Sequence, residues 1–385
     1  MKTLKIIIVI ILVIILIPVL SWVFWNFKSS HPLNILVVNK TVLDQDRKGH
    51  KALFWLLNNQ KFLTSDGKEY NIRKDYFGFH PLRPAKSLKY EVRRIKLTDI
   101  EDLSSKYDMA YYVDTYGVFF NEWYSSMQKG KGKGSLIEGG LNNSDYLFIK
   151  SLIEKGKLLI AEYNFFANPT DILVRKKTEE MLGIEWTGWI GSYMVSLNAK
   201  KSKDLPEWIV DLYNLNNKNK WSFNGPGIVL VNEGRKAVIV LEESNHLTET
   251  ILPELKTTNY GKEKYNLPAS ASFPRWFDIN TSTDNEIIAE CMLPVNESGQ
   301  AILDQNNIPA VFPAIMTSTR DSRYYYFAGD FVNYPVRLCT ARLNGISTIE
   351  GLFNGNNSKS HSFYYWSYYL PLVTTILSDY QASLK

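Results

Sequence analysis

The stretch KLLIAEYN, residues 157–164, decides how the rest of the chain is interpreted. Residues 158–161 are a short apolar run, which is typical of a strand buried inside a sheet. Glu162 follows this run directly, so a carboxylate stands where the strand ends. In open α/β sheets, ligands bind outside the carboxyl ends of the strands. The position of this acid therefore bears on whether the chain is an enzyme, a disabled enzyme or a binding module.

The segments around this stretch predict an α/β domain over residues 34–187. Apolar, β-branched runs alternate with amphipathic segments that have helical spacing. This alternation favours a doubly wound, mostly parallel sheet with helices on both faces. The strands are expected at 34–38, 90–97, 108–114, 157–161 and 183–186, and the helices between them include those at 48–60, 98–105, 142–156 and 170–182.

The pattern changes at about residue 188. Strand-like runs separated by Pro, Asn and Gly turns continue from there to residue 320, with few helical segments between them. We expect a β-rich insertion or second domain over 188–320. A final strand and a Tyr-rich C-terminal helix in 321–385 are expected to return to the α/β domain.

The N-terminal segment predicts a membrane anchor. An uncharged apolar run extends from Ile6 to Trp25, long enough at ~1.5 Å per residue to cross the ~30 Å core of a bilayer. No small-residue cleavage site follows it, and its terminal tryptophans suit an interfacial belt. Two lysines precede it, which favours a cytoplasmic N-terminus and an extracytoplasmic body. Residues 1–28 are therefore predicted to be an uncleaved signal anchor of a single-pass membrane protein of the cell envelope.

The composition narrows the classes of partner and cofactor. The 385 residues are 45% hydrophobic and 22% charged, which is a globular balance, and the net charge of +5 forms no compact basic stripe. Nucleic acid is therefore not expected as a partner. No H-E-x-x-H, C-x-x-C or P-loop motif occurs, so no metal and no cofactor are predicted. Cys291 and Cys339 either pair or remain two separate buried thiols.

Residues 136–183, which run from LIEGG to EEMLG, resemble the class I glutamine amidotransferase-like superfamily. Gly139-Gly140, the helix from Ser144 and the strand from Leu158 follow that family's order of loop, helix and nucleophile strand. The resemblance covers residues 34–186 together with the final strand and helix. It implies an amidotransferase-like or flavodoxin-like sheet.

The catalytic residues of that family are missing from this sequence. Glu162 stands where the family has a nucleophilic cysteine, and Ile160 and Asn164 stand at the flanking glycine positions. A cysteine nucleophile needs a sharp strand-to-helix bend beside oxyanion donors. The family's His-x-Glu pair is missing as well. Glutaminase activity is therefore excluded, and a non-catalytic or divergent relative is expected.

The candidate ligand-binding residues are those that follow the predicted strands, together with an aromatic pair. Trp186 and Trp189 lie in EWTGWIGSY at the boundary of the two predicted regions, either as a stacking platform for a ring-shaped ligand or as packing between the regions. The strand-end candidates are Asn39, Asp114, Tyr116, Glu162, Asn164 and Asp330.

Two functional hypotheses follow. The first is a non-catalytic module of a cell-envelope complex that binds a carbohydrate or a partner protein at the carboxyl ends of the strands. The second is a glycan hydrolase in which Glu162 and Asp114 form the acid/base pair, since two carboxyl groups suffice for glycoside hydrolysis.

Overall fold

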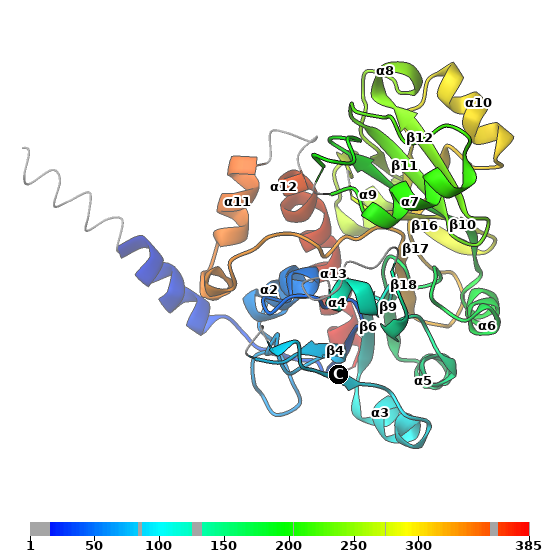
Figure 1. Ribbon diagram of the computed structural model, residues 1–385. Helices are drawn as coiled ribbons and strands as arrows, with labels where there is room; N and C mark the ends of the chain where they lie inside the picture. Colours follow the sequence, from blue (N-terminus) through cyan, green and yellow to red (C-terminus); the bar gives the residue numbers. More distant parts are fainter. Residues whose placement is uncertain are drawn as a thin grey trace, which may run out of the picture.

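A mixed sheet of ten strands organises the chain (Figure 1). The computed structural model describes residues 16–83, 87–124, 133–202, 204–273, 275–354 and 361–384. In order across the sheet, the strands are β14 (Ser270–Ser272), β13 (Glu254–Thr257), β16 (Asn285–Met292), β17 (Val311–Ser318), β18 (Tyr324–Phe327), β9 (Leu158–Ala161), β6 (Met109–Asp114), β2 (Ile35–Asn39), β4 (Phe77–Pro81) and β5 (Tyr90–Arg93).

The prediction of a mostly parallel sheet is wrong. The pairs β18–β9, β9–β6, β6–β2 and β2–β4 are parallel, whereas every other pair is antiparallel. Four of the ten strands, β13, β14, β16 and β17, lie in the region predicted to be a β-rich insertion. Strand periodicity shows that a segment is extended, but it does not show which sheet the segment joins.

A second sheet stands beside the first. Its four antiparallel strands are ordered β12 (Ala237–Glu242), β11 (Gly227–Asn232), β10 (Ile184–Met194) and β15 (Phe277–Ser282). In Figure 1 it occupies the upper right, with α7 (Glu207–Asn216), α8 (Glu243–His246) and α10 (Glu297–Gln305) around it. Two small pairs complete the strands: β1 (His31–Pro32) with β3 (Phe62–Leu63), and β7 (Val118–Phe119) with β8 (Leu136–Glu138).

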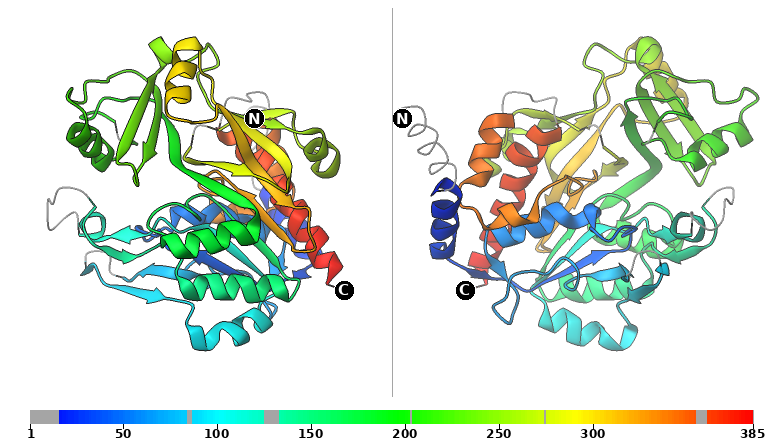
Figure 2. Two further views of the ribbon diagram at one scale, coloured as in Figure 1. Left: turned by 90° about the vertical axis from the view of Figure 1, so that its right-hand side faces the viewer. Right: turned by 60° about the vertical axis from the view of Figure 1, so that its left-hand side comes forward.

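Helices cover both faces of the parallel part of the large sheet, as the two views of Figure 2 show. On one face, α3 (Ile100–Lys106), α5 (Asn143–Glu154) and α6 (Ile172–Leu182) contribute to a core with Leu159 and Ala161. On the other face, Leu158 and Ile160 pack with a second set of helices. This set comprises α2 (Lys51–Asn59), the π-helical segment η5 (Tyr364–Tyr369) and α13 (Leu370–Ser383). The alternation along β9 explains why the whole run is apolar.

The remaining described helical elements are short or lie at the periphery. They lie between strands or near the C-terminus. These elements are η1 (Lys48–His50), η3 (Leu97–Asp99), α4 (Phe120–Trp123), α9 (Asn259–Tyr265), η4 (Leu338–Arg342), α11 (Ile346–Asn354) and α12 (His361–Phe363).

The predicted membrane anchor is contradicted. Over the ranges described above, no helix has the length and apolar character needed to cross a bilayer. The first part of the predicted run, residues 6–15, lies outside the described residues. Residues 16–27 are helical, and Trp25 at the end of this helix is buried against α2, where its indole N–H donates to the carbonyl oxygen of Asn59. The predictions of a signal anchor and of a single-pass membrane protein are corrected accordingly.

Candidate functional site

The carboxyl ends of the parallel strands meet at one edge of the large sheet. From β2 the chain goes to β4 on one side and to β6, β9 and β18 on the other, so this edge contains the topological switch point at which α/β sheets bind ligands. Asp114 ends β6, Glu162 follows β9 and Asp330 follows β18. Three of the predicted site residues therefore come together here.

Glu162 is the innermost of these acids and only 1% of its surface is exposed. One carboxylate oxygen, Oε1, accepts hydrogen bonds from the hydroxyls of Tyr111 at 2.5 Å and Tyr369 at 3.3 Å. The other, Oε2, accepts from the backbone N–H of Val332 at 3.2 Å. Burial, followed by the charge of Asp330, raises the pKa of Glu162 to about 8. These contacts tie η5 and the chain after β18 to the end of β9, so the side chain is engaged in the fold.

Asn164 joins three strands at this edge. Its backbone has φ 65, a left-handed conformation that asparagine tolerates better than most residues. Its N–H donates to Oδ2 of Asp278 at 3.0 Å, and its carbonyl accepts from the hydroxyl of Thr115 at 2.8 Å. Its Nδ2 donates to Oδ1 of Asp114 at 3.3 Å. The side chain amide is thus directed toward the acids.

Asp114 and Asp330 are the partly exposed acids of the group. Burial, followed by the charge of Asp330, raises the pKa of Asp114 to about 7. Burial also raises the pKa of Asp330 to about 6, although the hydrogen bond from Asn333 and the charge of Arg275 oppose this rise. Acids with perturbed pKa values that lie together are typical of functional sites. These two carboxyl groups can both meet a ligand and hold or release a proton near neutral pH.

The four-stranded sheet contributes a residue that the sequence prediction missed, Asp278 of β15. Its Oδ2 accepts from the N–H of Asn164 and, at 2.7 Å, from the hydroxyl of Tyr326. Burial, followed by the charge of Asp114, raises the pKa of Asp278 to about 7. The site therefore lies where the two sheets meet. The available signal was the period of two in WFDIN, which puts polar Asp278 and Asn280 on one side of a strand.

An aromatic pair lies beside the acids. The rings of Tyr163 and Trp276 are stacked with their centroids 6.5 Å apart, and Trp276 is partly exposed. The carbonyl of Trp276 accepts from the N–H of Asp330 at 2.9 Å. Burial, and then the charges of Asp278, Asp114 and Asp330, raise the pKa of the Tyr163 hydroxyl. The Tyr163 hydroxyl is thus within electrostatic reach of all three aspartates.

Several buried polar atoms at this edge have no hydrogen-bond partner among the described residues. They are Oδ1 of Asn164, Oδ1 of Asp278, and both Oδ1 and Nδ2 of Asn280. The three side chains are almost fully buried. Buried polar atoms are normally paired, so an unpaired set needs an explanation. Three of these four atoms are acceptors, so the site has more acceptors than donors.

Asn39 and Tyr116 lie at the same edge, but their side chains are engaged elsewhere. The Asn39 amide is 3.0 Å from Nδ1 of His50 and accepts from the N–H of Thr41. The Tyr116 hydroxyl donates to Glu122 at 3.0 Å. Among the described residues, neither side chain is hydrogen-bonded to Asp114, Glu162 or Asp330.

Trp186 and Trp189 both lie on β10, and neither forms an open stacking platform. Trp189 is 1% exposed and belongs to the core. Trp186 is partly buried, its indole N–H donates to the carbonyl of Trp189, and the Arg175 guanidinium lies 4.9 Å from the centre of its ring. The packing alternative of the prediction therefore describes their environment.

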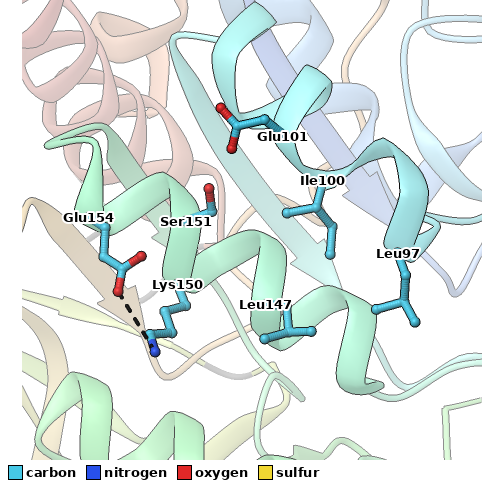
Figure 3. A pocket seen from close by; sticks show the side chains of 7 residues that line it. All are labelled: Leu97, Ile100, Glu101, Leu147, Lys150, Ser151 and Glu154. Atoms are coloured by element: carbon cyan, nitrogen blue, oxygen red, sulfur yellow. Dashed lines mark ion pairs between the residues drawn. The ribbon is translucent and has the colours of Figure 1, made fainter.

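A separate groove lies between α3 and α5 (Figure 3). It is formed by leucine and isoleucine side chains at one end and by charged side chains at the other, where Lys150 and Glu154 form an ion pair at 3.7 Å. None of the predicted site residues borders it. The residues that line the groove are Leu97, Ile100, Glu101, Leu147, Lys150, Ser151 and Glu154.

Two further predictions concern metals and cysteines. Within the described ranges, no group of three or more His, Cys, Asp or Glu side chains is arranged to hold a metal ion. Cys291 is buried and Cys339 is exposed, and both are free thiols. The two thiols are therefore separate, but the prediction that both are buried is wrong for Cys339.

Comparison with known proteins assigns no family. No protein-family model matches the chain, and no curated protein matches it. A solved β-galactosidase from Bacillus circulans sp. alkalophilus is 10% identical, with a TM-score of 0.35, over 78% of this chain and 30% of its own length. A protein described as ThuA-like, from Bacteroides uniformis ATCC 8492, is 10% identical, with a TM-score of 0.36, over 87% of this chain and 97% of its own. At TM-scores this low, neither likeness supports a conclusion about function.

Proposed function

We propose that this protein is a carbohydrate-binding module whose site is the sheet edge around Asp114 and Asp330. The observation that carries the proposal is that two partly exposed acids, Asp114 and Asp330, lie near Trp276, a partly exposed residue whose carbonyl oxygen accepts from the N–H of Asp330. Carboxylates accept hydrogen bonds from sugar hydroxyls, and a flat aromatic ring packs against the apolar face of a sugar. Arg275 and Asn333 add donors at the same edge.

A distant relationship to the class I glutamine amidotransferase-like superfamily remains part of this proposal. The order β6, α5, β9, α6 supports it. The nucleophile elbow of that family has no counterpart in geometry, because a loop separates Glu162 from α6, which begins only at Ile172. The left-handed residue is Asn164 rather than Glu162. A binding role fits these departures better than the family's acyl chemistry.

The test is saccharide binding by the purified full chain, measured by calorimetry with neutral and charged oligosaccharides. Replacing Trp276 with alanine removes the ring that packs on the sugar, and we expect affinity to fall by ~10-fold or more. The matched control is Trp22→Ala, an exposed tryptophan on the N-terminal helix, which should leave affinity unchanged. Failure of every saccharide to bind, or equal effects of the two variants, would refute the proposal.

Glycan hydrolysis is the second candidate, and one observation favours it. The pKa values of Asp114 and Asp330, about 7 and about 6, lie in the range that suits proton transfer at neutral pH. The pair would then be Asp114 and Asp330 rather than Asp114 and Glu162, because both oxygens of Glu162 are already hydrogen-bonded inside the fold. Release of reducing ends from a bound oligosaccharide, lost in Asp114→Asn, would establish this activity.

A further inference from the structure

We propose that the ligand of this edge carries a positively charged amino group, so that the preferred carbohydrate is a saccharide with free, protonated amines. The inference rests on the proposed function and narrows its ligand class. It is drawn from the unpartnered acceptors and from the unpaired charges of the site.

The first step concerns hydrogen bonds. The amide of Asn164 donates through Nδ2 to Asp114, while its Oδ1 has no partner among the described residues. The Oδ1 of Asp278 is also unpartnered, although its Oδ2 is hydrogen-bonded twice. Both side chains are more than nine-tenths buried. An ammonium group has three donors and no acceptor, so it complements such a surplus of acceptors.

The second step concerns charge. Asp114, Glu162, Asp278 and Asp330 are linked through their mutual electrostatic effects. None of the four forms an ion pair with a Lys, Arg or His among the residues that the structure describes, where the ion pairs involve other acids. Arg275 acts on Asp330 only from beyond ion-pair distance. Without a cation, burial keeps these acids protonated to a higher pH, and a cationic ligand would stabilise their ionised form.

The third step separates an organic cation from a metal ion. A metal ion requires its ligands within a single small coordination shell, and the carboxyl groups described at this edge are not arranged as a group of three around such a point. A protonated amino sugar reaches separate acids through several donors, namely its ammonium group and its hydroxyls. Its ring would pack on Trp276, as in the proposed function. The geometry therefore favours an amine over a metal ion.

The experiment compares matched oligosaccharides on the full chain by calorimetry. The probes are a glucosamine tetrasaccharide, its fully N-acetylated form, cellotetraose and the non-sugar amine spermidine. The titration is run at pH 7, above the pKa of Asp330 of about 6 and below the ~7.7–8.0 of a free α-amino group, and we expect the glucosamine oligomer to bind ~10-fold tighter than the acetylated form, as one charge-assisted hydrogen bond would give. In Asp330→Asn this preference should fall to about twofold or less. The control Asp304→Asn, an exposed acid on α10, should retain it.

The outcomes separate this inference from the proposed function. Binding of cellotetraose and both glucosamine forms with equal affinity would overturn the amine preference and leave carbohydrate binding intact. Binding of spermidine but of no saccharide would support the amine and overturn the carbohydrate. Binding of none of the probes would overturn both. If Ca²⁺, added as calcium chloride, binds while none of the amines does, and if this binding is lost in Asp278→Asn, the ligand is a metal ion and the amine proposal is overturned.

Discussion

Glu162 shows how a single carboxylate can be committed to the fold. Its two oxygens accept from two tyrosine hydroxyls and one backbone N–H, and these donors come from β6, from η5 and from the chain after β18. A buried hydrogen-bond network of this kind fixes the relative positions of its donors. Glu162 therefore supports the edge at which Asp114 and Asp330 lie.

The corresponding prediction is that Glu162→Ala is strongly destabilising. The substitution leaves the Val332 N–H and one tyrosine hydroxyl without an acceptor, because Tyr111 and Tyr369 can still bond each other at 2.8 Å, and it opens a cavity, so we expect the free energy of unfolding to fall by about 2–4 kcal/mol. Urea denaturation followed by fluorescence would measure it. Glu154→Ala, at an exposed position on α5, should change the free energy by no more than ~0.5 kcal/mol. A Glu162→Ala variant as stable as the parent but unable to bind ligand would assign the residue to the site instead.

At the scale of elements, the turn that precedes α5 depends on a close approach of two backbones. Gly140 has φ 65, and a Cβ built on it would lie 2.7 Å from the backbone of Pro169 and Thr170. This contact holds the start of α5 against the loop that follows β9. Gly156, at the other end of α5, has φ 68 but nothing within 4 Å of its Cβ position. The two glycines therefore have similar backbone conformations, but only Gly156 has room for a Cβ atom.

This difference gives a matched pair of substitutions. Gly156→Ala should cost only the strain of a left-handed alanine, about 1–2 kcal/mol, while Gly140→Ala should cost at least ~2 kcal/mol more because backbone atoms must move. Thermal and urea unfolding of both variants would provide the comparison. Equal destabilisation by the two substitutions would show that the approach at Gly140 is readily relieved.

At the scale of the whole molecule, the acids at the meeting point of the two sheets make stability depend on pH. Folding raises the pKa of Asp114, Asp278 and Glu162 to about 7, 7 and 8, from 3.8, 3.8 and 4.5. Between the unfolded and folded values, the folded state binds more protons than the unfolded state. Its stability therefore falls as the pH rises through this interval.

The buried histidines act in the opposite direction at lower pH. Burial lowers the pKa of His50 to about 3 and that of His80 to about 4, so their contribution is lost as the pH falls below about 6.5. Between about pH 6.5 and 8, the change in stability with pH is therefore expected to come from the acids and not from these histidines. We expect the melting temperature to fall across this window, and to fall less in Asp114→Asn. A melting temperature that is constant or rises with pH would contradict the raised pKa values.

Much of the local structure follows from sequence patterns. The apolar run that becomes β9, the strand that becomes β6 and the acids that follow them were predicted because strand periodicity and chain order are local properties. The same reasoning places Asp114, Glu162, Asn164 and Asp330 at one edge once the strands are parallel. It does not reveal that Glu162 faces two tyrosines, because Tyr369 is far away in the sequence.

The sequence by itself therefore determined the central strands and the acids at their ends. Only the tertiary structure decided that β13, β14, β16 and β17 extend the same sheet, that Trp25 packs against α2, and that Asp278 joins the site from a second sheet. The reason is physical: hydrophobic patterning specifies which face of an element is buried, whereas the partner that buries it is chosen by contacts between residues far apart in the chain.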